Sequence, residues 1–269
     1  MKLKGIDISQ YQGTIDFDKL KRSEVDFVMI RAGFGLQLDS MFKRNISECN
    51  RVGIPCGIYW FSYALTEAEA RAEARLALSV VKEYVLEYPI AYDFEDDSVR
   101  WLHENGVNVT PAIAQGIVRA FLDEVKEGGY YGVNYTNLNF INLYGFDKIK
   151  ADMWLALWTK YYSGSEPPRP CTMWQYTDSG RVAGISTNVD SDFCYVDYPT
   201  LIIKKGMNRL VEPAWKEQAS PWAVEAVDWA VTNGILQGKG GDNYDLQGSL
   251  TREQMCVMLK RYYDKFGGK

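Results

Sequence analysis

The segment AYDFEDD, residues 91–97, places four carboxylates in a stretch that begins as an apolar run. In an extended strand the side-chain period is two residues, so Asp93 and Glu95 project from one face, and Tyr92 and Phe94 from the other. Two neighbouring carboxyl groups removed from water repel each other, which raises the pKa of one of them. A protonated acid beside an ionised partner can cleave a glycosidic bond. Two alternatives fit the same motif: a solvated acidic loop, and a Mg²⁺ site for phosphate chemistry.

Two further acids stand at the ends of predicted strands elsewhere in the chain. Asp7 closes the strand that leads into DISQYQG, and Asp190 ends the predicted strand STNVD. In a parallel barrel the carboxyl ends of the strands meet at one rim, and this rim carries the chemistry. We therefore predict that Asp7, Asp93, Glu95 and Asp190 form one acidic site.

The elements that must position these acids are short strands alternating with helices up to about residue 200. The predicted strands are LKGIDIS, VDFVMIRAG, IPCGIYWFSY, YPIAYDFE, GYYGVNYT, MWLALW, TMWQYT and STNVD. Helix starts are marked by Thr66 with Glu69, and by Thr110 before Pro111. Between GVNYT and STNVD the connections lack long helical patterns. We predict an α/β fold, an incomplete TIM-like (β/α) barrel of about eight strands whose last strands are joined without full helices.

The chain is long enough for a barrel and a second, smaller domain. We predict a barrel over residues 1–205, a linker over 206–219 and a two-helix domain over 220–269. In the last region Ser220-Pro221 begins one helix, and Thr251 with Gln254 forms a capping box before the next. Two short helices bury little area, so we expect them to pack on the barrel, on another copy, or on both.

Composition and charge exclude several classes of protein. The net charge of −5 argues against non-specific nucleic-acid binding. The apolar runs are too short to span a membrane, and the N-terminus shows no targeting segment. Five scattered cysteines predict reduced thiols, and the single histidine, His103, falls in a predicted loop. We therefore expect no metal, no other cofactor, and no nucleic-acid or membrane partner.

The acids lie within a series of ordered segments: GIDISQYQG, FVMIRAGFG, DSMFKRNISECNRVGIPCGIYWFSYA, YDFED, GVNYTN, MWLALW and MWQYTDSGRVAGISTNVDSD. This series resembles the family 25 glycoside hydrolases, the lysozyme-type muramidases of bacteria and phages, over roughly residues 3–200. The resemblance implies a peptidoglycan hydrolase that cuts the β-1,4 bond between N-acetylmuramic acid and N-acetylglucosamine.

The resemblance also implies roles for single residues. Glu95 is implied as the general acid, and Asp93 as the partner that orients the acetamido group or stabilises positive charge. Asp7 and Asp190 are implied as flanking carboxylates. Attack by water and attack by the 2-acetamido group both remain open. Candidates for substrate contacts sit on or beside the matching strands: Arg31, Tyr59, Phe61, Tyr135, Trp154, Trp174 and Gln175.

Some of these residues allow more than one role. Arg31 could pair with Asp7 or Asp93 and hold it ionised. Asp39 falls where the family carries an acid after the second strand, and an ordinary loop or cap role fits it equally well. The aromatic residues could contact sugar faces or fill the barrel interior. Asp96 and Asp97 are predicted to be solvated loop acids.

The segment from residue 220 to 263 resembles a single S-layer homology repeat. The resemblance rests on Trp229-Ala230, Gly234-Ile235, Gly238 and the triplet Thr251-Arg252-Glu253. It implies binding of a secondary cell-wall polymer by that triplet, and Arg252 at a helix N-terminus suits an anionic glycan. Such repeats usually occur in threes, so one repeat implies either a reduced wall anchor or a homo-oligomer with avidity. The alternative is a helical pair that only packs on the barrel.

These features together predict an endolysin that acts on bacterial peptidoglycan. We expect it to be made in the host cytoplasm without a signal peptide and to act on the cell wall after release. Two alternatives are a non-catalytic glycan-binding protein on a decayed barrel, and a metal-dependent phosphoryl-transfer enzyme.

Overall fold

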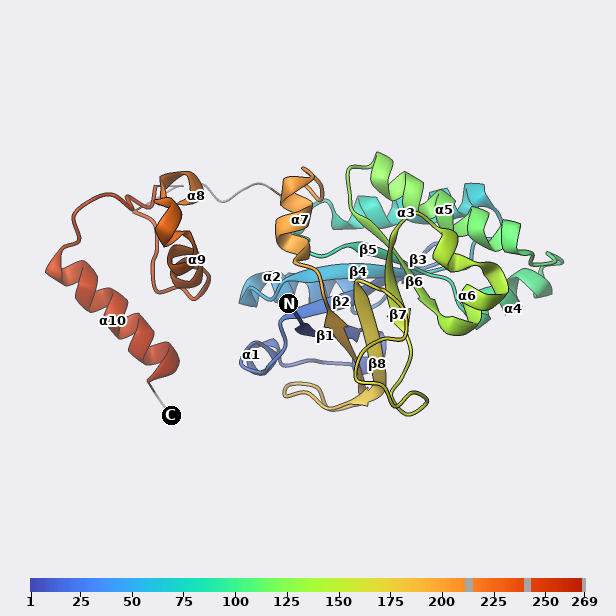
Figure 1. The fold of residues 1–269 in the computed structure, drawn as a ribbon, viewed down its shortest axis with the longest axis horizontal. Helices are drawn as coiled ribbons and strands as arrows, with labels where there is room; N and C mark the ends of the chain where they lie inside the picture. Colours follow the sequence, from blue (N-terminus) through green and yellow to red (C-terminus); the bar gives the residue numbers. More distant parts are fainter. Residues whose placement is uncertain (211–214, 240–242, 268–269) are drawn as a thin grey trace. The chain divides into compact units, whose positions relative to one another are not determined.

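A computed structural model describes residues 1–210, 215–239 and 243–267 of the chain. The chain divides into two compact units, Met1–Leu210 and Val211–Lys269. The strands of the described residues all belong to the first unit (Figure 1).

Within residues 1–210, nine strands form one sheet, and eight of them close into a barrel. The order around the barrel is β1, β2, β4, β5, β6, β7, β8 and β9, and β9 pairs with β1. The short strand β3 pairs with β2 outside this ring. The strands are β1 (Leu3–Ile8), β2 (Phe27–Phe34), β3 (Gln37–Leu38), β4 (Cys56–Phe61), β5 (Ile90–Asp93), β6 (Gly132–Asn137), β7 (Asp152–Ala156), β8 (Met173–Gly180) and β9 (Val189–Cys194). The predicted barrel of about eight strands is confirmed.

Strand β9 corrects one detail of the prediction. Asp190 was predicted at the end of the last parallel strand, but β9 is antiparallel to both of its neighbours, and Asp190 lies near its amino end. An antiparallel strand presents its amino end where parallel neighbours present their carboxyl ends. Asp190 therefore still reaches the predicted rim, where it is the register partner of Asp7.

Helices surround the barrel, and the last of them packs Tyr198 and Ile202 against the inner apolar cluster. They are α1 (Phe17–Lys21), α2 (Phe42–Val52), α3 (Glu67–Val81), α4 (Asp96–Glu104), α5 (Pro111–Glu127), α6 (Leu138–Tyr144) and α7 (Tyr198–Lys204). The predicted caps are present, because Thr66 accepts from Glu69 N and Thr110 from Ile113 N. Of the three connections predicted to lack helices, 157–172 and 181–188, both fully described, contain none, but the connection from β6 to β7 contains the short helix α6, which corrects the prediction there. Within the described ranges, no helix is long and apolar enough to cross a membrane.

The alternation of side chains along the strands creates two apolar clusters. One lies between the barrel and the helices and includes Ile58, Trp60 and Phe121. The other uses the opposite strand faces and includes Met29 and Trp154. Because the inner face is already filled by such large side chains, the polar residues of the inner face collect at one end, where the acids lie.

The second unit contains α8 (Trp215–Gln218), α9 (Val224–Thr232) and α10 (Arg252–Phe266). Thr251 caps α10: its hydroxyl accepts from Gln254 N at 3.1 Å, and its own N–H donates to Gln254 Oε1 at 2.9 Å. No residue of α9 or α10 is fully buried. Large apolar side chains of this unit are exposed, including Trp222 at 88 % and Tyr263 at 63 %. Helices α9 and α10 therefore bury little of their own apolar surface, whereas Trp215 of α8 is buried.

Candidate active site

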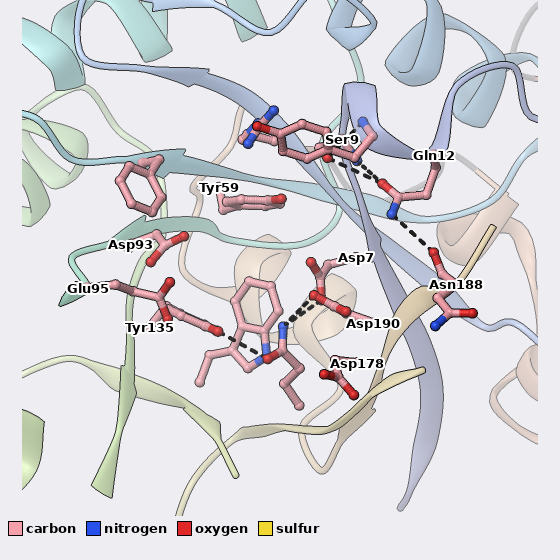
Figure 2. Close-up of a pocket in the computed structure, with 15 residues that line it drawn as sticks. Asp7, Ser9, Gln12, Tyr59, Asp93, Glu95, Tyr135, Asp178, Asn188 and Asp190 are labelled. Atoms are coloured by element: carbon pink, nitrogen blue, oxygen red, sulfur yellow. Dashed lines mark hydrogen bonds between the residues drawn. The ribbon is translucent and has the colours of Figure 1, made fainter. Parts of the chain in front are cut away.

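A cavity of about 360 Å³ lies at the end of the barrel that the acids occupy (Figure 2). Asp7, Asp93, Glu95 and Asp190 all line it, so the structure brings together the four acids predicted from distant segments. The remaining lining residues are Ser9, Tyr11, Gln12, Arg31, Tyr59, Phe61, Tyr135, Trp154, Gln175, Asp178 and Asn188. Six of the seven predicted substrate contacts are among them.

Gln175 connects two of the acids. Its Nε2 donates to Asp7 Oδ2 at 2.9 Å and lies 3.4 Å from Asp190 Oδ2. Its Oε1 accepts from the Tyr135 hydroxyl at 3.1 Å and from Trp158 Nε1 at 3.0 Å. Because both ends of the amide are engaged, the donor end is fixed toward the carboxylates.

Asp93 and Glu95 reach the cavity in a way that differs slightly from the prediction. The strand was predicted to continue through Glu95, but β5 ends at Asp93, and Glu95 is the N-cap residue of α4. The backbone of Glu95 remains extended, with φ −128° and ψ −169°. The two-residue alternation therefore continues past the strand, and both carboxylates line the cavity.

Two buried serines fix the backbone beside Glu95. Glu95 N donates to Ser98 Oγ at 3.2 Å, and Ser98 Oγ donates to Ser62 O at 2.8 Å. Ser62 N in turn donates to Asp93 O at 2.8 Å. Strand β5, the segment after β4 and the start of α4 are thus tied together around the acid pair.

A buried glutamate, Glu73, binds the outward-facing side of β5 and the segment after β4. The Tyr92 hydroxyl donates to Glu73 Oε2 at 2.6 Å and lies 2.8 Å from Ser62 Oγ. Tyr63 N donates to Glu73 Oε1 at 3.0 Å. Burial raises the pKa of Glu73 to about 8. This network fixes the outer face of β5, and with it the direction in which Asp93 points.

Burial is the main reason why the pKa of each acid in the site is raised. The pKa of Glu95 is raised to about 7 by burial and next by the charge of Asp96, and that of Asp190 to about 6 by burial and next by Asp178. The pKa of Asp93 is raised well above its usual value by burial and by Glu95. Burial and the charge of Asp192 likewise raise the pKa of Asp7. Near neutral pH the site therefore holds both protonated and ionised carboxyl groups.

Asp192 is an acid beneath the site that the sequence analysis missed. It is fully buried, its Oδ1 accepts from Trp154 Nε1 at 2.8 Å, and its Oδ2 has no hydrogen-bond partner among the described residues. Asp192 lies two residues after Asp190, so the alternation that pairs Asp93 with Glu95 could have identified it. Asp178 was also missed, because register shifts in β8 after Gln175 break the two-residue alternation that would have placed it.

Arg31 has a different partner from those predicted. Its Nε donates to Asp39 Oδ2 at 2.8 Å, and both side chains are largely buried. Asp39 also accepts hydrogen bonds from Gln10 N, after β1, and from Met41 N, before α2. Asp39 therefore connects Arg31 to both of these loops. The guanidinium nevertheless lowers the pKa of Asp93, which partly opposes the effect of burial. Asp39 is thus a residue that positions the Arg31 guanidinium at the cavity.

Several other predicted placements need correction. Trp174 is absent from the cavity lining, because on β8 it alternates with the inward-facing Gln175, and its Nε1 donates to Leu157 O. Asp96 and Asp97 are exposed as predicted, but they form the first turn of α4 and not a loop. His103, predicted in a loop, is exposed near the end of the same helix.

The predicted wall-binding residues lie in the second unit. Thr251 caps α10, and Arg252 is exposed at its first position. Glu253, with Lys239 and Arg261, lines a separate cavity of about 570 Å³. Neither in this unit nor in the described part of the barrel do three or more His, Cys, Asp or Glu side chains form a group suited to a metal ion.

A closed barrel with acids gathered at one end is typical of hydrolases that use carboxyl groups. Comparison with known proteins identifies the family. Residues 6–185 match the model for glycosyl hydrolases family 25, so the chain belongs to that family. The match ends before Asp190 and Asp192, whose place in the site rests on the barrel geometry. Residues 216–256 match the S-layer homology domain.

Individual relatives agree with this assignment. The chain is 30 % identical over 197 residues to the autolytic lysozyme of Clostridium acetobutylicum. The matched region is 71 % of this chain and 55 % of that protein. The chain is also 30 % identical to the modular autolysin LytC of Streptococcus pneumoniae, with a TM-score of 0.62 over 72 % of this chain and 47 % of the other. The catalytic domain of the endolysin ply40, from bacteriophage P40 of Listeria monocytogenes, is 27 % identical with a TM-score of 0.62, over 77 % of this chain and 98 % of that domain. The chain thus spans about half the length of the curated relative that it matches.

Proposed function

We propose that this protein hydrolyses peptidoglycan at the β-1,4 bond between N-acetylmuramic acid and N-acetylglucosamine, with Glu95 as the general acid. The observation that carries the proposal is the pairing of Glu95 with Asp93 in one buried cavity, where the pKa of Glu95 is raised to about 7. An acid of this kind can hold a proton at neutral pH and deliver it to a leaving oxygen. The relatives support the substrate class, since they are named as a lysozyme, an autolysin and an endolysin.

In the proposed reaction, the proton of Glu95 passes to the glycosidic oxygen as the bond to the anomeric carbon breaks. Positive charge then develops on the sugar ring, where the carboxylate of Asp93 stabilises it. Asp93 Oδ1 is buried without a partner among the described residues, so it can alternatively accept the N–H of a 2-acetamido group. Either water or the acetamido oxygen attacks the anomeric carbon, and in the end water supplies a hydroxyl and returns a proton to Glu95.

Asp7 and Asp190 are proposed to assist from the opposite side of the cavity. Their shared donor, Gln175, keeps them in a fixed position without neutralising them. Tyr59, Tyr135 and Trp154 pack edge to face beside them and exclude water from the reacting bond. Together these groups make a negative, partly dry environment that favours a positively charged transition state.

For the second unit we propose cell-wall binding. A secondary wall polymer would meet Arg252 at the start of α10, where the helix N-terminus adds to the attraction for anions. The exposed apolar side chains of α9 and α10 support assembly of several copies through this unit. We further propose that the enzyme reaches the wall after release from the cell that makes it.

Two measurements test the catalytic proposal. Purified Gram-positive cell walls should lose turbidity with the wild type and not with Glu95→Gln, while circular dichroism shows the same fold for both. The new reducing end should be muramic acid; a glucosamine end would mean that a different bond is cut. Wild-type protein that binds walls without cleaving them would instead identify a non-catalytic glycan-binding protein.

A further inference from the structure

A second, more apolar groove of about 480 Å³ lies beside the acidic cavity in the first unit. The residues that line it include Phe34, Leu36, Tyr63, Leu65, Glu73 and Trp101. None of these residues has a part in the proposed chemistry. The groove therefore requires a separate explanation.

Aromatic rings connect the groove to the cavity. Phe61 lines the acidic cavity, and its ring centroid lies 5.3 Å from that of Tyr63, which lines the groove. Tyr63 also packs edge to face on Trp101 at 5.8 Å and on Phe34 at 6.4 Å. A ligand that extends past Phe61 would thus pass directly onto this aromatic surface.

The exposed rings of the groove have free polar groups. Trp101 is 39 % exposed, and Tyr63 is partly exposed. Among the residues that the structure describes, no hydrogen bond engages Trp101 Nε1 or the Tyr63 hydroxyl. A pyranose ring offers an apolar face of C–H groups and a rim of hydroxyl and amide groups, which matches rings that carry a free donor at one edge.

We propose that this groove is an accessory subsite that binds a 2-acetamido sugar of the same glycan strand, beyond the sugars that flank the cleaved bond. The inference rests on the proposed function, because the cavity holds only the region of the reacting bond and a polymer must continue past it. Stacking of a sugar on Trp101 and Tyr63 would add binding energy for long strands that short ones cannot obtain.

Turnover of peptide-free glycan strands of two lengths tests the proposal. Trp101→Ala should lower the ratio of kcat/KM on long strands to kcat/KM on short strands by roughly threefold to tenfold, the range expected for one aromatic contact. Trp101→Phe, which keeps a flat ring, should restore most of the ratio. Leu143→Ala removes another exposed apolar side chain of this unit and should leave the ratio unchanged.

Three results would overturn the proposal. An equal loss on both lengths would mean that Trp101 only supports the fold. No loss on either length would mean that the groove is not used. If Trp101→Ala lowers turnover only on a third substrate, long strands that keep their stem peptides, the groove binds the peptide and not the sugar.

Binding separates this proposal from the assignment of the catalytic acid. In the Glu95→Gln background, calorimetric titration with the long peptide-free strand should show weaker binding when Trp101→Ala is added. If the wild type cleaves no glycan but this difference in binding remains, the proposed function fails and the subsite stands. If cleavage occurs but the binding difference is absent, the subsite fails alone.

Discussion

Asp7 on β1 and Asp190 on β9 face each other across an antiparallel strand pair and point toward the same donor, Gln175 Nε2. Asp192, two residues further along β9, lies buried near the same pair and raises the pKa of Asp7. Three carboxyl groups from two adjacent strands are therefore crowded into one region of low polarity. Such crowding favours function at the expense of stability, because every ionisation there is opposed by burial and by neighbouring charge.

Asp192→Asn should stabilise the fold at neutral and alkaline pH. The pKa of Asp192 is raised in the folded state, so its ionisation costs stability as pH rises above the usual aspartate range. Asparagine keeps an oxygen acceptor for Trp154 and replaces the unpartnered oxygen by a donor. We expect Tm at pH 8 to rise by roughly 2–4 °C, the shift that corresponds to about 1 kcal/mol at this size.

Differential scanning calorimetry at pH 4 and pH 8 measures this effect. The difference from wild type should shrink at pH 4, because the carboxyl is then protonated in the folded state and, with an ordinary pKa of about 3.9, roughly half protonated in the unfolded state. Asp123→Asn, at an exposed position of α5, serves as the control and should change Tm little at either pH. A lower Tm for Asp192→Asn at pH 8 would contradict the account of Asp192 as a destabilising buried acid.

Asp96→Asn should move the alkaline limb of the pH–activity profile to lower pH. Activity requires protonated Glu95, so kcat/KM should fall as pH rises through about 7. The charge of Asp96 helps to raise the pKa of Glu95, and its removal favours the ionised form. Because Asp96 is exposed, solvent screening limits the shift to a few tenths of a pH unit.

Asp97→Asn is the matched control for this experiment. Asp97 also raises the pKa of Glu95, but it is paired with Arg100 at 2.8 Å. Its removal should therefore move the alkaline limb less than Asp96→Asn does. A shift of the limb toward higher pH in either variant would show that a group other than Glu95 controls it.

Ser98→Ala should lower kcat more than it changes KM. The change removes the acceptor of Glu95 N and the donor to Ser62 O, so the start of α4 loses its link to the segment after β4. We expect kcat to fall about tenfold, because small displacements of a catalytic group are costly. Stability should fall by about 1 kcal/mol for the lost hydrogen bonds.

Steady-state kinetics and thermal denaturation distinguish the two effects of Ser98→Ala. Ser79→Ala on α3 also loses a bond from a serine hydroxyl to a backbone carbonyl, and should leave kcat unchanged. If Ser98→Ala lowers Tm while the folded enzyme keeps its full kcat, Ser98 only supports the fold and does not position Glu95.

Arg252→Gln should weaken binding to cell walls without changing turnover of soluble glycan fragments. The side chain is exposed at the first position of α10, where it can meet an anionic polymer. Co-sedimentation with purified walls at two salt concentrations measures the change, and the salt dependence of binding should decrease with the lost charge. Lys260→Gln, on the same helix and paired with Asp264, is the control; equal losses in both variants would point to net charge and not to the start of α10.

Sequence by itself determined the class of fold and most of the site. The alternation in AYDFE put Asp93 and Glu95 on one face, and the strand-like segments around Asp7 and Asp190 predicted a common rim. These inferences succeeded because strand periodicity and the shared edge of a barrel are local or generic properties. Cap residues such as Thr110 and Thr251 were likewise readable, since their hydrogen bonds span only three residues.

Only the tertiary structure decided which strands and which side chains pair with one another. The pairing of β9 with β1 and the bond from Gln175 to Asp7 join segments far apart in the chain. The ion pair of Arg31 with Asp39 spans eight residues, but it depends on how the chain turns back after β2. The raised pKa of Glu95 likewise arises from burial, which depends on everything packed around it. Such properties follow from packing and mutual distance, and no pattern of neighbouring residues in the sequence encodes them.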